Sequence, residues 1–422
     1  MKTAAAFGPL TLTALALCAQ APAALAQAAG GAKPPVAQAW IDVATFSGMG
    51  MGMPGGGSGG MFGSLFAGGG RGAADKPPFL STQTSSSGRF LDVTLSTRAN
   101  PQLAQGRQAV PAGLQMGPQL NLLAPTDGRT VPLDRDESPD TTERPKGRIL
   151  LYWGCGNTVR AGQPRVLDMA TLRPDEAART FIARRATQRG VHSAQGRPHW
   201  PNPSEGKTLA DSASLIGEHQ FSGAGVPEGF RFSLAQANDV MPALSLTSTD
   251  QGGATALEWN ALPTARGYFA GAVASRGENE MVIWSSSEQP DTGSGLFDYQ
   301  TNPAVERWVK EKVVLEPGTT RCSVPKGVLP TEGAMLRLIA YGPELNLVHP
   351  PRPADARAAW DPQWAVKLRV KSMATSMSGM PTMGEAMKEE TRPTGGQAGT
   401  AERDGVPKIP GAADLLRGLF GR

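Results

Sequence analysis

Residues 364–371 read WAVKLRVK and form the clearest strand pattern in this chain of 422 residues. Apolar and charged side chains alternate along the segment: Trp364, Val366, Leu368 and Val370 share one face, and Lys367, Arg369 and Lys371 share the other. Successive side chains of a β-strand point to opposite faces, so a period of two is typical of a strand. The segment therefore predicts a half-buried strand whose apolar face packs on a core.

Six more strand patterns precede this one, and turn residues separate them. They cover residues 243–248, 255–261, 267–275, 281–286, 321–325 and 334–341. Seven short strands with turns between them are typical of a β-sandwich, which we predict for residues 243–371. Residues 303–312 (PAVERWVKEK) interrupt the series and predict a short helix that packs on the sandwich.

The first half of the chain predicts a separate β-rich domain over residues 36–240. Residues 40–46 (WIDVATF) and 90–98 (FLDVTLSTR) alternate in the same way and predict the two arms of a hairpin. Residues 174–189 predict a helix, with Pro174 in its first turn and a glycine after its end. Further strands are predicted at residues 148–153, 165–169, 215–221 and 230–235.

Composition favours a folded, mainly β protein with disordered segments. The chain has 52 glycines and 36 prolines, with 18% charged and 6% aromatic residues. These values exclude a coiled coil, a mainly helical bundle and a transmembrane bundle. Residues 48–72 predict a disordered Gly/Met-rich insertion, residues 126–146 a polar loop, and residues 372–410 a disordered Met-rich linker.

The N-terminus has the features of a signal peptide. Lys2 precedes an apolar run over residues 10–19, which is too short to span a bilayer, and Ala24-Leu25-Ala26 offers a small-x-small cleavage pattern. Residues 1–26 are therefore a predicted signal peptide with cleavage near Ala26. We expect the mature chain in the periplasm or secreted.

Two cysteines, Cys155 and Cys322, remain after removal of this leader. In an oxidising compartment they can form a disulfide. The alternative is two buried, unpaired thiols that act as small hydrophobic side chains. Sequence alone leaves both open, because it does not place the two Cα atoms within bonding distance.

Residues 257–275 (LEWNALPTARGYFAGAVAS) resemble the second and third strands of fibronectin type III domains. In that family a buried tryptophan precedes a proline-containing turn and a tyrosine, and Trp259 and Tyr268 stand at these positions. Residues 321–341 (RCSVPKGVLPTEGAMLRLIAY) look like a later pair of strands of the same family. The resemblance implies a fibronectin/immunoglobulin-like sandwich that serves as an extracytoplasmic binding or scaffolding module.

The whole chain also resembles a group of uncharacterised exported proteins of Gram-negative bacteria. The shared features are the early Gly/Met insertion, GRILLYWGCG at residues 147–156, RAGQPRVLD at residues 160–168 and LLRGLFGR at residues 415–422. This resemblance implies export and no particular activity.

Methionine-rich segments suggest a candidate metal site. Met377, Met380 and Met383 have the M-x-x-M spacing at which thioethers can bind the soft ions Cu(I) or Ag(I). The alternative is that these methionines make adaptable apolar contacts, because no His or Cys lies nearby. We expect no other cofactor.

The sequence gives little support to a catalytic site. Cys155 lies on a glycine-flanked turn where a nucleophile could stand, and a hydrolase would need a distant base such as His219. A structural turn or half of a disulfide explains Cys155 without catalysis. Recognised nucleotide-binding, zinc-protease and serine-hydrolase motifs do not occur in the sequence.

Expected partners are an unknown protein or another envelope component. The formal net charge of +4 is too small for nucleic-acid binding, and no basic stripe alternates with aromatic residues. Residues 411–422 form an amphipathic tail that can contact a membrane surface or dock on the core, through Leu415, Leu416, Leu419 and Phe420. The sequence thus predicts an exported, non-enzymatic binding or scaffolding protein.

Overall fold

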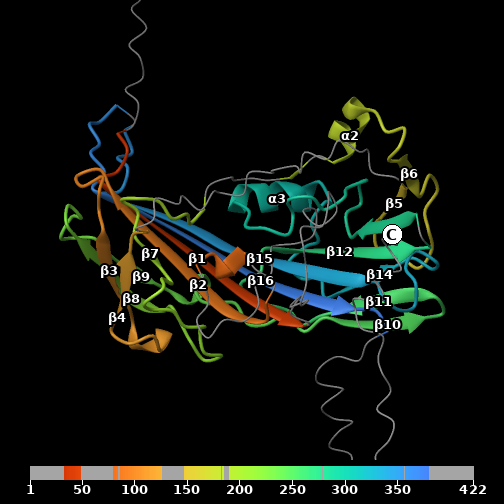
Figure 1. The fold of residues 1–422 in the computed structure, drawn as a ribbon, viewed down its shortest axis with the longest axis horizontal. Coiled ribbons are helices and arrows are strands. Elements are labelled where there is room, and N and C mark those ends of the chain that lie inside the picture. The colour runs from red at the N-terminus through yellow and green to blue at the C-terminus, as the bar shows by residue number, and fades with distance from the viewer. Residues whose placement is uncertain are drawn as a thin grey trace, which may run out of the picture. The chain divides into compact units, whose positions relative to one another are not determined.

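The structure is a computed structural model that describes residues 33–48, 79–83, 86–125, 147–181, 183–184, 190–277, 279–355 and 357–379. The chain divides into two compact units, Met1–Pro34 and Pro35–Arg422, and every element below belongs to the second. Strands make up most of the regular structure, which confirms the predicted mainly β fold (Figure 1).

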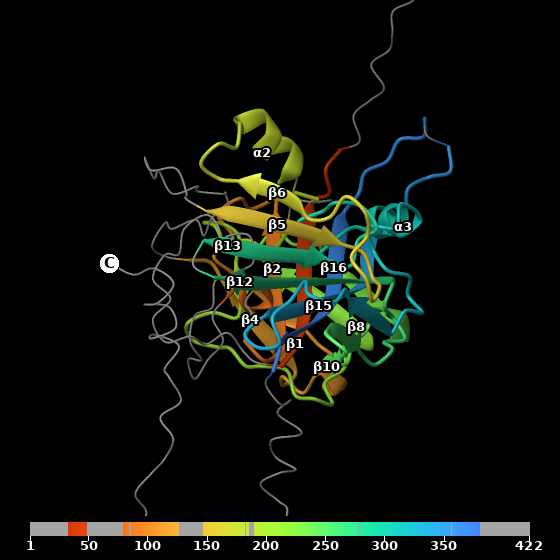
Figure 2. The same cartoon turned by 90° about the vertical axis from the view of Figure 1, so that its right-hand side faces the viewer.

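Most strands in the described ranges belong to one large mixed sheet of 13 strands. In spatial order they are β6 (Arg165–Asp168), β5 (Arg148–Trp153), β13 (Glu280–Ser285), β12 (Gly267–Arg276), β15 (Met335–His349), β16 (Trp364–Met377), β1 (Ala37–Gly48), β2 (Gly88–Thr97), β7 (His199–Trp200), β4 (Gln119–Leu123), β3 (Gln105–Ala109), β8 (Gly217–Gly223) and β9 (Arg231–Leu234). Figure 2 shows β6, β5, β13 and β12 following one another in this order. Neighbouring strands are antiparallel except at two junctions, β1–β16 and β13–β5.

A second sheet of three strands packs against part of the first. It contains β10 (Thr247–Gln251), β11 (Ala254–Glu258) and β14 (Arg321–Val324). Leu257 and Val324 of this sheet belong to the same buried apolar cluster as Leu336 and Leu338 of β15. The strands predicted for the sandwich thus divide into β10-β11-β14 on one side and β13-β12-β15-β16 on the other, which is a sandwich-like arrangement.

The predicted boundary between residues 240 and 243 does not separate two sheets. β1 pairs with β16 in parallel along all 12 of its residues, and β5 pairs with β13 in parallel on the other side. The outer strands of a sandwich carry unpaired backbone groups, and here strands from the first half of the chain satisfy them. The strands of the two predicted domains therefore share one sheet.

The predicted hairpin arms are confirmed, because β1 and β2 pair antiparallel from Ala37 opposite Thr97 to Phe46 opposite Gly88. The strands β3, β4 and β7 were missed by sequence reasoning. Their side chains alternate less clearly, as in Gln105–Ala109 (QGRQA). Residues 243–246 are not part of the strand predicted there, which begins at Thr247.

Two α-helices and three short 3₁₀ turns are described. The turns are η1 (Ser81–Gln83), η2 (Ala112–Leu114) and η3 (Gln236–Asn238). The helix α3 (Asn302–Lys310) confirms the predicted short helix, and it buries Val305 and Trp308 against the large sheet.

The other helix, α2 (Pro174–Thr180), is shorter than the predicted 174–189. Beyond the end of the helix, Arg184 makes tertiary contacts. The backbone N–H of Arg184 donates to the carbonyl of Ser294 at 2.9 Å, and the Arg184 guanidinium pairs with Asp291. Residues 183–184 are therefore not helical, and residues 182 and 185–189 of the predicted helix lie outside the described residues.

Candidate functional site

The charged face of β16 is buried, contrary to what alternation alone suggests. Arg369 is 4% exposed and Lys371 is 3% exposed, and only Lys367 is partly open to solvent. Segments from elsewhere in the chain cover this face. The ring of Tyr299 lies on it, and the backbone at residues 190–191 approaches Arg369 and Asp42.

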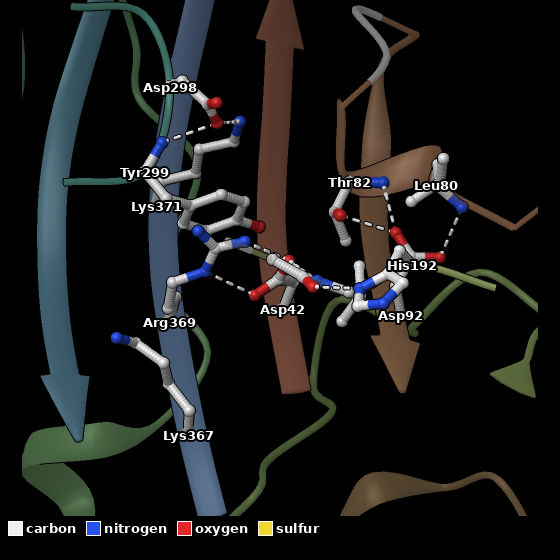
Figure 3. A network of polar contacts seen from close by, with 12 residues as sticks. Asp42, Leu80, Thr82, Asp92, His192, Asp298, Tyr299, Lys367, Arg369 and Lys371 are labelled. Carbon is white, nitrogen blue, oxygen red and sulfur yellow. Dashed lines mark hydrogen bonds and ion pairs between the residues drawn. The ribbon is translucent and has the colours of Figure 1, made fainter. Parts of the chain in front are cut away.

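A row of charged residues crosses three neighbouring strands at the centre of this face. Asp92 of β2, Asp42 of β1 and Arg369 of β16 stand directly opposite one another in the strand register. Arg369 Nε donates to Asp42 Oδ1 at 2.7 Å, and its Nη2 donates to Asp42 Oδ2 (Figure 3). Two parallel bonds between guanidinium and carboxylate give a charge pair of defined geometry.

Asp92 anchors a short segment that we call the clasp, residues 79–83. The backbone N–H groups of Leu80 and Thr82 each donate to the Asp92 carboxylate at 2.9 Å, and the Thr82 hydroxyl donates to it as well. Figure 3 shows the clasp held over the sheet by these bonds. The buried Asp92 carboxylate thus accepts three hydrogen bonds from a segment outside the sheet.

Burial raises the pKa of Asp92 from 3.8 to about 7, and the negative charge of Asp42 adds to this rise. The hydrogen bonds from Thr82 and Leu80 act in the opposite direction and do not offset it. A buried carboxyl group beside a second carboxylate favours its neutral form. Asp92 therefore changes its protonation state near neutral pH.

Lys371 and Tyr299 form the other end of the network. Lys371 Nζ and Arg369 Cζ each lie 4.3 Å from the centre of the Tyr299 ring, and Lys371 Nζ lies 3.5 Å from Asp298 Oδ1. Burial lowers the pKa of Lys371 and raises that of Tyr299. The cations pack on the electron-rich ring face, which reduces the penalty of removing them from water.

A second row lies two residues along the strands from the first, on the same face. It contains His199, Thr94, Trp40 and Lys367. Lys367 Nζ pairs with Glu344 and lies 5.3 Å from the centre of the Trp40 ring. Burial lowers the pKa of His199 to about 4, so its imidazole is neutral at pH 7. The ring of Phe79, from the clasp, lies 4.4 Å from the His199 ring.

The two rows join the sheet to three covering segments: the clasp, residues 190–193 and the loop before α3. The paired charges Asp42–Arg369 and Glu344–Lys367 compensate one another. Such a network can hold segments together and can present hydrogen-bond donors to a ligand. We treat this face as the candidate functional site.

Stability should respond to pH through Asp92. Between pH 4 and 7 the folded protein keeps a proton on Asp92 that the unfolded chain has released. The free energy of unfolding therefore falls as pH rises through this window, by on the order of 4 kcal/mol from this group. The variant Asp92→Asn cannot titrate there. In urea unfolding from pH 4 to 8, the free energy of unfolding of the wild type should fall relative to that of Asp92→Asn as the pH rises.

The control for this prediction is Asp175→Asn, because Asp175 is an exposed carboxylate of α2. Its unfolding curve should run parallel to that of the wild-type chain. If Asp92→Asn also ran parallel to the wild type, Asp92 would have an ordinary pKa in the folded state.

The structure contains a disulfide, which is one of the two alternatives that the sequence leaves open for the cysteines. Cys155 and Cys322 are bonded at 2.11 Å, with their Cα atoms 5.3 Å apart. Cys155 follows β5 and Cys322 lies in β14, so the bond ties the large sheet to the small one.

The structure does not bring together the predicted catalytic pair. A disulfide-bonded Cys155 is no free nucleophile. His219 lies in β8, near the opposite end of the large sheet from β5. Its Nε2 lies 2.8 Å from the carbonyl of Leu215, and its ring stacks on Phe232 at 5.3 Å. His219 is thus a satisfied core histidine.

The predicted soft-metal site is only partly within the described ranges. Met377 is the last residue of β16, whereas Met380 and Met383 lie outside the described residues. Within those ranges, no group of three or more His, Cys, Asp or Glu side chains is arranged to hold a metal ion. Copper or silver binding stays a prediction.

Other predicted features also lie outside the described residues. These are the signal peptide 1–26, residues 49–72 of the insertion, the polar loop 126–146, residues 380–410 of the linker, and the tail 411–422 with Leu415, Leu416, Leu419 and Phe420. The start of the predicted disordered linker 372–410 differs from the prediction, because residues 372–377 continue β16 and pair with β15. Among the helices that the structure does describe, none has the length and apolar character for crossing a membrane.

Sequence reasoning missed Asp42, Asp92 and Tyr299. A signal for the two aspartates was present, because each stands in the same local context, WIDV and FLDV, with apolar residues on both sides. A charged residue at a strand position that should be buried indicates a paired charge. Tyr299 has no comparable signal, since it lies in a loop that only tertiary packing places on β16.

Comparison with known proteins does not assign the chain to a class. No family model matches it, and neither does any curated protein or solved structure.

Proposed function

We propose that the protein is exported and acts in the periplasm, or outside the cell, as a non-enzymatic binding or scaffolding protein of the envelope. The observation that carries the proposal is the disulfide between Cys155 and Cys322. Structural disulfides form and persist in oxidising compartments and are rare in the cytosol. The N-terminal sequence, with its apolar run and cleavage pattern, supports the same location.

A fibronectin type III-like module within the fold is part of this proposal. Its support is the division of seven strands into three and four, as in two-sheet sandwiches. Trp259 and Tyr268 pack with ring centres 5.7 Å apart, and the backbone N–H of Leu262 donates to the Tyr268 hydroxyl at 2.9 Å. The sandwich architecture does not fix a function by itself, and the scaffolding role is what the resemblance implies.

A hydrolase with Cys155 as nucleophile is not part of the proposal, because that thiol is bonded to Cys322. Soft-metal handling through the methionines has no supporting contact among the described residues, so it is not included either. The expected partner is a protein or another component of the envelope.

Cell fractionation with thiol labelling tests the proposed location. In a Gram-negative host, we expect the chain to lose residues 1–26 and to appear outside the cytoplasm. Cys155 and Cys322 should react with an alkylating reagent only after reduction. The matched control begins at Gln27 without the leader, and its thiols should react directly in the cytosol. Recovery of the full-length chain in the cytosol with its leader intact and both thiols free would contradict the proposal.

Crosslinking tests the scaffolding role. The exported protein, crosslinked in intact cells and purified under oxidising conditions, should retain a defined envelope component. The variant Cys322→Ala serves as the comparison, because it loses the bond between the two sheets. Turnover of an ester, glycoside or peptide substrate by the purified protein would instead favour an enzyme.

A further inference from the structure

The clasp covers a buried carboxyl group that has no cation of its own. Asp42 and Asp92 stand directly opposite each other on the antiparallel strands β1 and β2, and both are 0% exposed. Side chains at such positions lie about 5 Å apart at their Cβ atoms. Arg369 pairs with Asp42 through two hydrogen bonds, and among the described residues no ion pair involves Asp92. Asp92 is therefore the uncompensated carboxyl group of the row.

Opening of the clasp would uncover this group. Ser81 and Thr82 are 2% and 0% exposed, and the hydrogen bonds from Leu80 and Thr82 end on the Asp92 carboxylate (Figure 3). Leu80 has a backbone φ of 72°, in the left-handed region that residues with a side chain rarely adopt. Release of the clasp would relieve this strain, and the bonds to Asp92 act against that release.

The charge of Asp92 decides which position of the clasp is favoured. A protonated carboxyl group is neutral and keeps acceptor lone pairs, so it can stay buried beside Asp42 and still bond to the clasp. An ionised Asp92 is repelled by Asp42 and lacks the hydration that water provides. Burial raises the pKa of Asp92 to about 7, and contact with water would bring it back toward its ordinary value. Opening is therefore coupled to loss of the proton, and it becomes more favourable as pH rises from about 4 to about 7.

Other titratable and charged groups face Asp92 or its row from the neighbouring elements. They are His199 of β7, His192 of the segment 190–193, Asp298 and Tyr299 of the loop before α3, and Arg369 and Lys371 of β16. Burial lowers the pKa of both histidines and of Lys371, and it raises that of Tyr299. The variant Asp92→Asn separates the titration of these groups from that of Asp92.

We propose that the clasp is a proton-dependent cover of the candidate site, closed while Asp92 is protonated and displaced when Asp92 is ionised. Displacement moves Phe79 away from the ring of His199 and opens the β2 end of the charged row to solvent. The inference goes beyond the proposed binding role, because it concerns access to this face and not the partner.

Hydrogen exchange followed by mass spectrometry tests this proposal on the full chain with its disulfide intact. The amides of Leu80 and Thr82 donate to Asp92, so they exchange when the clasp opens. After correction for the intrinsic exchange rate, we expect their protection to fall about 10- to 100-fold from pH 5 to pH 8. The amides that pair β1 with β2 should stay more protected, because these strands do not open with the clasp.

Two variants separate the proton from the hydrogen bonds. In Asp92→Asn the side chain cannot titrate, so the protection of the clasp should not depend on pH. Thr82→Val has the same shape without the hydroxyl donor. It should lower the protection of the clasp about tenfold at both pH values and leave their ratio unchanged.

An internal control is the segment that Asp239 holds. This half-buried carboxylate accepts bonds from the backbone N–H groups of Leu215 and Val240 and from the Ser214 hydroxyl, which is the same set of donors that the clasp offers. It lies outside the strands, so no carboxyl group stands opposite it in a sheet. Protection of the Leu215 amide should change by less than about threefold between pH 5 and pH 8.

The proposal is overturned if the clasp amides have the same protection at pH 5 and pH 8, and this measurement decides even if Asp92→Asn does not fold. It is also overturned if β1 and β2 lose protection to the same extent, since the whole fold would then open. A wild-type pH dependence in Asp92→Asn would overturn it too, since another group would then titrate. None of these results changes the fractionation and crosslinking outcomes, so failure of the cover is distinguishable from failure of the proposed function.

Discussion

Replacement of Arg369 by methionine is expected to lower the free energy of unfolding by about 3–5 kcal/mol. Arg369 donates two hydrogen bonds to Asp42, and both side chains are at least nine-tenths buried. Methionine has a similar length and preserves much of the packing. The variant therefore leaves Asp42 as a buried carboxylate without its cation, and this isolated charge is the source of the loss.

Urea unfolding measures this loss, and two further proteins control it. Arg148→Met removes the exposed partner of Glu280 and should change stability by less than about 1 kcal/mol. The double variant Asp42→Leu/Arg369→Met removes both charges and should recover most of the stability. A loss below about 1 kcal/mol in Arg369→Met alone would mean that another group compensates Asp42.

Removal of the disulfide is the second large effect. Cys155→Ala and Cys322→Ala should each lower the free energy of unfolding by about 2–5 kcal/mol. The bond joins residues separated by 167 positions, so it removes much conformational freedom from the unfolded chain. Both variants should therefore unfold at a lower denaturant concentration than the oxidised wild type.

Reduction of the wild-type protein provides the matched measurement. Dithiothreitol should shift the unfolding midpoint of the wild type to that of the alanine variants and leave those variants unchanged. If reduction left the wild-type midpoint where it was, the bond would not contribute to stability, and the two sheets would hold together by packing alone.

Local sequence patterns located much of the β structure. The strands β12, β13 and β14 lie close to their predicted positions, and α3 does too. Alternation and turn residues act over a few positions, so a single strand can be recognised from its own residues. β15 and β16 extend further than predicted, because their pairing with each other continues past the clear alternation.

The sequence predicts only part of the candidate site. The charged residues of β16 were recognised as one face of a strand, but their burial was not expected. Asp42 and Arg369 are 327 positions apart, and their contact depends on the parallel pairing of β1 with β16. No local pattern reports a contact at such separation.

The sequence by itself determined the strand segments, the sandwich-like pattern of the second half and the two cysteines available for a disulfide. Tertiary structure alone decided that strands from both halves share one sheet, that the cysteines meet, and that a charged strand face is covered. The physical reason is the range of the forces involved. Side-chain alternation is written into neighbouring residues, whereas backbone pairing and the burial of charge depend on which distant segments come together.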